Sequence, residues 1–73
     1  MNEKTKDKNG FMEDEVRIIK ISIKGLSRKD MADKLGMKFE TLKAHLTDIF
    51  FRLGIHSIFQ LALYAVKMGY AVM

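Results

Sequence analysis

Cysteine is absent from this sequence of 73 residues. Its absence excludes disulfide bonds and any zinc site built on thiolates. The two histidines, His45 and His56, lie too far apart in the sequence to suggest a metal site by themselves, so we expect neither a bound metal nor a cofactor. A domain this short, without such cross-links, depends for its stability on efficient helix packing or on oligomerisation.

Long uninterrupted apolar runs are also missing. The segment 1–10 is polar and rich in lysine, and it lacks the apolar stretch of a signal peptide. The apolar run 55–73 is interrupted by His56, Gln60 and Lys67, whereas a helix that spans a membrane needs about 18–20 consecutive apolar residues. We therefore expect a cytoplasmic protein without a membrane segment.

The residue patterns of common enzyme sites are absent as well. The chain has no glycine-rich phosphate loop, and no histidine stands with a serine and a carboxylate in a recognisable order. We expect a binding protein and not an enzyme. The formal net charge of +4 favours polyanionic partners, above all nucleic acid.

Proline is absent too, and glycines mark the ends of the predicted segments instead. Gly25, Gly36, Gly54 and Gly69 each follow a segment with helical periodicity, as glycine does just beyond a helix end. The pattern predicts helices over about 12–24, 28–35, 39–53 and 58–68, the second and fourth capped by Ser27 and Ser57. The expected fold is all-α, a four-helix bundle in domain 11–73 that follows a flexible basic arm, 1–10.

The third predicted helix has two contrasting faces. Its buried stripe is expected to consist of Leu42, Leu46, Ile49 and Leu53, with Phe39 and Phe50 beside them. The opposite face carries Thr41, Lys43, Ala44, Thr47, Asp48 and Phe51. A tight turn over 35–38 joins this helix to the short one before it. The stretch from Gly25 to Gly54 thus has the outline of a helix-turn-helix that binds DNA.

The fourth predicted helix is apolar on nearly every side, which is typical of a buried helix. In a domain of this size one side of the last helix should face outward. Burial against a second copy of the chain resolves the conflict and predicts a homodimer. The candidate interface residues are Ile58, Leu61, Tyr64, Ala65 and Met68.

The chain resembles a known family at these positions. The residues that carry the resemblance are Leu26-Ser27-Arg28-Lys29-Asp30-Met31-Ala32, Leu35, Met37, Thr41-Leu42-Lys43, His45, Ile49, Arg52-Leu53-Gly54-Ile55, Ser57 and Gln60. This ordered set is similar to the DNA-binding domain of LuxR-type regulators. The chain length is most similar to the stand-alone GerE-like members. A sigma-factor promoter-recognition region has a related fold, but its outline matches less well.

The resemblance implies that the third helix enters the major groove of double-stranded DNA and that the fourth forms a dimer contact. By position, Lys43, Ala44 and Thr47 would face base edges, while Thr41 and His45 would lie against backbone phosphates. The start of the second helix would add phosphate contacts from Ser27, Arg28 and Lys29. Lys38, at the start of the third helix, completes the candidate DNA-binding residues.

Two departures from the family pattern support an alternative. Lys38 replaces the serine that usually caps the reading helix, a loss of about 1 kcal/mol, and Asp48 replaces an asparagine and adds negative charge. The alternative is an interaction module that pairs with a full-length regulator through its last helix and binds DNA weakly or not at all. Two residues stay open as well: His45 could be a packing residue, and Phe51 a partner contact or an edge of the core.

Overall fold

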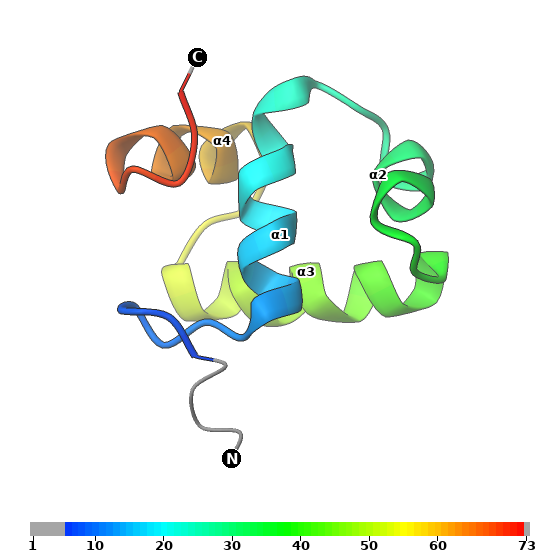
Figure 1. Ribbon diagram of the computed structural model, residues 1–73, viewed down its shortest axis with the longest axis horizontal. Helices are drawn as coiled ribbons and strands as arrows, with labels where there is room; N and C mark the ends of the chain where they lie inside the picture. The colour runs from blue at the N-terminus through cyan, green and yellow to red at the C-terminus, as the bar shows by residue number, and fades with distance from the viewer. Residues whose placement is uncertain (1–5, 73) are drawn as a thin grey trace.

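A computed structural model describes residues 6–72 of the chain. These residues form α1 (Glu13–Ile21), the short 3-10 helix η2 (Ser22–Lys24), α2 (Arg28–Leu35), α3 (Phe39–Leu53) and α4 (Ile58–Lys67), with no strand among them. Figure 1 shows α1 in the centre and α3 running across its first turn, with α2 and α4 on either side. The predicted all-α fold with four α-helices is confirmed.

Most of the predicted helix ends are confirmed. They are formed by local features of the chain, which are capping hydrogen bonds at the starts and glycines at the ends. The Ser27 hydroxyl oxygen accepts the N–H of Asp30 at 3.1 Å, and that of Ser57 accepts the N–H of Gln60 at 3.2 Å. Gly36 and Gly54 end α2 and α3 with φ near +70°, a conformation that costs glycine nothing.

The first helix is shorter than predicted. It ends at Ile21, where the chain tightens into η2. The buried Ser22 hydroxyl donates to the carbonyl of Ile19 at 2.6 Å. A serine that bonds to the backbone in this way competes with regular helical bonding, and a 3-10 turn is a common way to end a helix.

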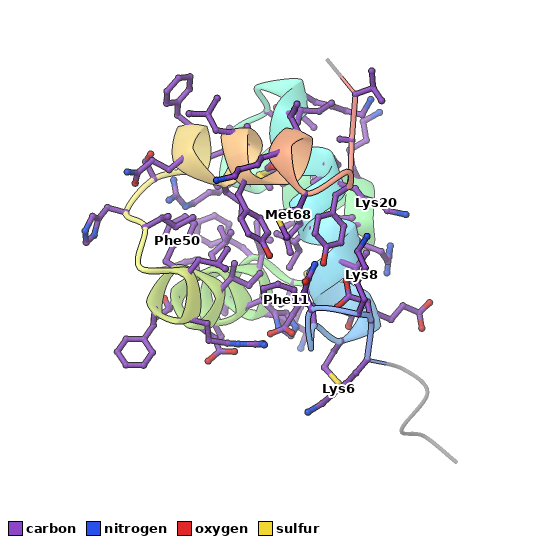
Figure 2. All side chains as sticks on the ribbon, turned by 90° about the vertical axis from the view of Figure 1, so that its left-hand side faces the viewer. Lys6, Lys8, Phe11, Lys20, Phe50 and Met68 are labelled. Atoms are coloured by element: carbon purple, nitrogen blue, oxygen red, sulfur yellow. The ribbon has the colours of Figure 1, made fainter. Side chains whose placement is uncertain are left out.

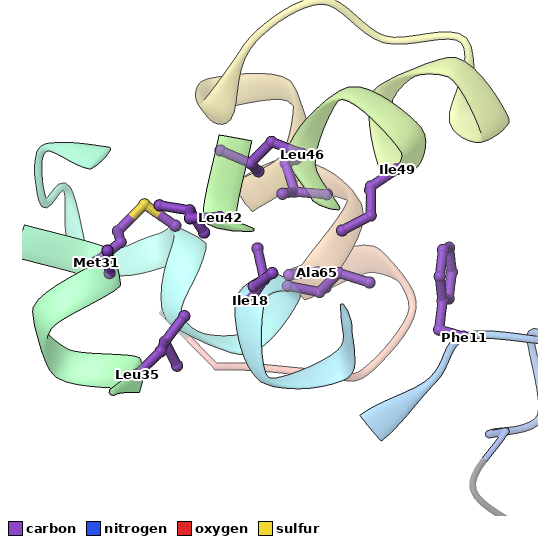
Figure 3. Packing of buried hydrophobic residues seen from close by; sticks show 11 residues of the cluster. Phe11, Ile18, Met31, Leu35, Leu42, Leu46, Ile49 and Ala65 are labelled. Carbon is purple, nitrogen blue, oxygen red and sulfur yellow. The ribbon is translucent and has the colours of Figure 1, made fainter. Parts of the chain in front are cut away.

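A single hydrophobic core joins the four helices (Figure 3). The predicted stripe of α3 is confirmed for Leu42, Leu46 and Ile49, which are buried, while Leu53 packs at the edge of the core. The prediction was wrong for Phe39, whose side chain is exposed at the first turn of α3. The other members of the core are Phe11, Ile18, Ile19, Met31, Ala32, Leu35, Leu61 and Ala65.

The second half of the predicted arm is joined to the C-terminal tail. Residues 1–5 lie outside the described residues, so the flexibility of the arm and its boundary at Gly10 stay predictions. The Asp7 carboxylate accepts the backbone N–H groups of Asn9 at 3.0 Å and Phe11 at 2.8 Å. It also accepts the Tyr70 hydroxyl, which in turn accepts the side-chain amide of Asn9 at 2.9 Å. The segment 7–11 is therefore held by a clasp, formed by Asp7, Asn9 and Tyr70.

Both titratable groups of this clasp have shifted pKa values. Burial raises the pKa of Tyr70 to about 12, and its hydrogen bond to Asp7 acts in the same direction. Burial alone would raise the pKa of Asp7, but the hydrogen bonds from Tyr70, Phe11 and Asn9 outweigh it and hold the pKa below the usual 3.8. The clasp therefore requires a neutral tyrosine and an ionised aspartate.

Replacing Tyr70 with phenylalanine should remove a pH-dependent part of the stability. The contribution of Tyr70 is full below the ordinary pKa of 10 and is lost as the pH rises toward 12. The contribution of Asp7 is full above 3.8 and is lost as the pH falls through its lowered pKa. Near pH 7 we expect Tyr70→Phe to lower the free energy of unfolding by about 1–2 kcal/mol, and the deficit should shrink at both extremes.

Urea unfolding of both proteins at pH 3, 7 and 11 measures this deficit. Tyr64→Phe is the matched control, because the structure gives its hydroxyl no hydrogen bond within residues 6–72, although burial also raises its pKa. A deficit for Tyr70→Phe that stays constant from pH 3 to pH 11 would contradict the coupling of Asp7 and Tyr70.

Candidate nucleic-acid interface

The turn between α2 and α3 is rigidly built. The N–H of Gly36 donates to Asp33 O at 3.2 Å, and that of Met37 donates to Ala32 O at 3.0 Å. The Arg17 guanidinium, from α1, donates to Leu35 O at 2.8 Å and ties the end of α2 to the first helix. Since α2 also packs directly on α3, the relative orientation of the two helices is set by packing and by these bonds together.

The outer face of α3 presents the predicted base-contacting residues to solvent. Lys43, Ala44 and Thr47 are all exposed. The Lys43 ammonium lies 3.9 Å from the Glu40 carboxylate and 5.4 Å from the centre of the Phe39 ring. These exposed contacts are weak, so Lys43 can exchange them for a base. The Thr47 hydroxyl donates to Lys43 O at 3.0 Å.

One flank of this face carries positive charge. Arg28 at the start of α2 and Lys43 on α3 both border a shallow groove of about 360 Å³ between the two helices, which His56 also lines. The other predicted phosphate contacts at the start of α2, Ser27 and Lys29, are exposed, and so is Lys38 at the start of α3. Lys38 is the N-cap of α3 and makes no capping bond with its side chain. The structure thus brings most of the predicted cations to the N-terminal end of α3.

The other flank differs, and His45 lies on it. His45 is half-buried and lines a small groove with Met12, Glu13 and Asp14 at the start of α1, whereas Thr41 on the same helix is exposed. The acidic side chains beside His45 oppose the approach of a phosphate. Phosphate contact from His45 stays a prediction, and the geometry gives this residue a packing role as well.

The predicted interface residues of α4 do not lie on one outer face. Leu61 and Ala65 are fully buried in the core of the chain itself, so their side chains are not available to a second copy. Tyr64 packs edge-on against Phe11 and stacks on Tyr70. Ile58 and Met68 are partly buried, and Figure 2 shows Met68 on the inner side of the end of α4.

The exposed apolar side chains of α4 are Phe59, Leu63 and Val66, which we call the α4 patch. Phe59, the most exposed of them, keeps 70% of its surface accessible. A helix with apolar residues on nearly every side gives no periodic signal to show which side faces inward. For that reason the sequence prediction assigned Leu61 and Ala65 to the interface, although both are buried in the core.

The comparison with known proteins identifies the family. Residues 13–65, more than half of the chain, match the sequence profile of the bacterial regulatory proteins of the luxR family. The chain belongs to the luxR family. This family consists of regulators with a helix-turn-helix domain that binds DNA. The resemblance and the fold stated from the sequence are thereby confirmed.

Two relatives show how much of a luxR-type protein this chain represents. It is 45% identical over 51 residues to the Fimbriae Z protein of Escherichia coli K12, and 39% identical over 51 residues to the Fimbriae Z protein of Salmonella typhimurium LT2. Each match covers 70% of this chain but only 24% of the relative. The chain therefore spans about a quarter of the length of these curated relatives, and a stand-alone role stays a prediction.

A set of contacts that joins the last turn of α3 to the start of α1 was missed by the sequence analysis. Arg52 of α3 lies 3.4 Å from the buried Glu15 carboxylate, donates to Gly10 O at 3.1 Å, and stacks 4.4 Å from the centre of the Phe11 ring. The Arg52 guanidinium is therefore held beside Phe11 and Glu15 at the start of α1. One signal was present: Phe11 directly precedes the N-cap Met12, where an apolar residue often packs back on the helix.

Within residues 6–72, no group of three or more metal-binding side chains is found. Over the same residues, no single helix is long and apolar enough to cross a membrane. α3 and α4 pass that test only as a pair, bent by 63°.

Proposed function

We propose that the protein is a sequence-specific transcription regulator that binds DNA as a homodimer, with α3 in the major groove. One observation carries the proposal. Lys43, Ala44 and Thr47 form an exposed face on a helix whose opposite side is buried in the core. A reading helix needs this combination, because its position must be fixed while its base-contacting side chains stay accessible.

The chemistry of this face suits base recognition. The Lys43 ammonium can donate to O6 or N7 of guanine, and the methyl groups of Ala44 and Thr47 can contact the methyl group of thymine. The free N–H groups at the start of α2 can bind a phosphate, with Arg28 and Lys29 next to them. Ser27, Lys38, Thr41 and His45 are the further candidates for contacts with the DNA backbone.

The α4 patch is the contact surface that we propose for the homodimer. It replaces the interface predicted from the sequence, since Leu61 and Ala65 lie in the core. Phe59, Leu63 and Val66 expose apolar surface that a second copy would remove from water. To contact two half-sites one turn of DNA apart, the two reading helices of such a dimer would have to lie about 34 Å apart. A regulator of a bacterial chromosome acts in the cytoplasm, in line with the predicted location.

Selection of bound sequences from a random duplex library tests this proposal. We expect an enriched palindromic motif whose half-sites are centred about one helical turn apart. A single half-site would contradict the homodimer alone. No enrichment over the starting library would contradict sequence-specific binding.

The alternative is an interaction module that pairs with a full-length regulator, and the charges of the second flank favour it. Glu13 and Asp14 adjoin His45, and Asp48 is exposed on α3. Fluorescence anisotropy with random-sequence duplex at several salt concentrations separates the two functions. A DNA-binding protein should lose affinity steeply as salt rises, whereas an interaction module should show little binding at any concentration.

A further inference from the structure

Phe51 is the most exposed phenylalanine in the described part of the chain. Its side chain keeps 85% of its surface accessible, although its own helix also contributes Leu42, Leu46 and Ile49 to the core. The adjacent Phe50 packs against the core, and Arg52 is held by Glu15 and Gly10. Phe51 therefore contributes almost nothing to the stability of the fold, and its apolar surface is left for something outside the chain.

The position of Phe51 on α3 places it in line with the proposed base-contacting residues. It follows Ala44 by seven residues, which is close to two full turns, and Thr47 by four, which is about one turn. Seven residues advance about 10 Å along the helix axis. Successive base pairs are about 3.4 Å apart, so this advance corresponds to about three base pairs along the groove.

The surroundings of Phe51 do not suit a phosphate. Phe51 borders a shallow groove whose lining surface is mostly apolar. The other residues that line it are Thr47, Phe50, Gly54, Ile55 and His56. Asp48, about one helical turn earlier, is exposed, and its negative charge repels the phosphates of the DNA backbone. Among the groups that bases present in the major groove, the thymine methyl is the apolar one, and phenylalanine is a suitable contact for it.

We propose that Phe51 is a further specificity-determining residue, which contacts a thymine methyl group about three base pairs from the position read by Ala44. This inference rests on the proposed function, because it requires α3 to lie in the major groove. It extends the reading face from the first half of α3 to its last turn. It also gives a reason for the unusual exposure of this ring.

Replacing single thymines by deoxyuridine tests the contact, because deoxyuridine lacks only the methyl group. The probe is the duplex selected by the wild-type protein, with one thymine at a time exchanged. At one thymine per half-site, outside the positions read by Lys43 and Ala44, the exchange should weaken wild-type binding about fourfold. Phe51→Ala should bind the unmodified duplex roughly tenfold less tightly, and this exchange should then have no effect.

Two further variants serve as controls. Phe51→Leu keeps an apolar side chain and should keep most of the fourfold ratio. Val72→Ala shortens an apolar side chain that is 88% exposed, outside α3, and should keep the full ratio. If Phe51→Ala shows the same ratio as the wild type at every thymine, the inference is overturned while the proposed function stands. If the wild-type protein binds no duplex, the proposed function fails and the inference with it.

Discussion

The Lys43→Glu variant should lose at least a hundredfold of its affinity for the selected duplex and keep its fold. The substitution removes the donor to guanine, worth about 1–3 kcal/mol. It also places a carboxylate close to the negatively charged phosphates of the DNA backbone. The fold should be unaffected because Lys43 is exposed and its contacts with Glu40 and Phe39 are at the surface. Anisotropy with the selected duplex measures the affinity, and thermal unfolding checks the fold.

Lys20→Glu is the control with the same change in charge. Lys20 lies in the last turn of α1, at the end away from α3 (Figure 1). Long-range electrostatics should cost this variant only a few-fold in affinity at physiological salt, where charges more than about 8 Å apart are screened. Equal losses for the two variants would show that Lys43 acts through net charge and not through a base contact.

The Phe11→Ala variant should be the most destabilised of the simple substitutions. Phe11 is 1% exposed and packs against Tyr64 and the Arg52 guanidinium. Removing a buried phenylalanine costs about 3–5 kcal/mol, whereas a domain of this size has a total stability of only about 4–11 kcal/mol. We expect the urea midpoint to fall by about half or more, with loss of the native helical signal at moderate temperatures.

Phe51→Ala provides the matched control for this measurement. It removes the same side chain from an 85% exposed position and should change the free energy of unfolding by less than about 0.5 kcal/mol. If Phe11→Ala were equally mild, the segment 7–11 would not form part of the core in solution, and the clasp with Tyr70 would lose its support.

Much of the scaffold was predictable because its signals are local. The serine caps at Ser27 and Ser57 and the glycine stop at Gly36 act within one helical turn. The buried stripe of α3 repeats with the period of the helix itself. The resemblance to the family predicted the reading face, and the structure shows that Lys43, Ala44 and Thr47 are exposed.

The details of the site were less predictable because they depend on contacts far apart in sequence. The charge difference between the two flanks of α3 arises when Glu13 and Asp14 of α1 are brought beside His45. Nothing in the sequence indicated that Arg52 of α3 would contact Glu15 and Gly10, which lie near the start of α1. A periodicity within one helix carries no information about which residues of another helix will face it.

The sequence by itself determined four helical segments, the turn between α2 and α3, and the outward side of α3, because hydrogen bonding and amphipathic periodicity act over a few residues. Only the tertiary structure decided which side of α4 is buried, why Phe11 belongs to the core, and how Asp7 reaches Tyr70. Those outcomes depend on the packing of surfaces separated by tens of residues. For the same reason, the outer patch of α4 and the exposed ring of Phe51 became candidates for binding only once the core had been assigned.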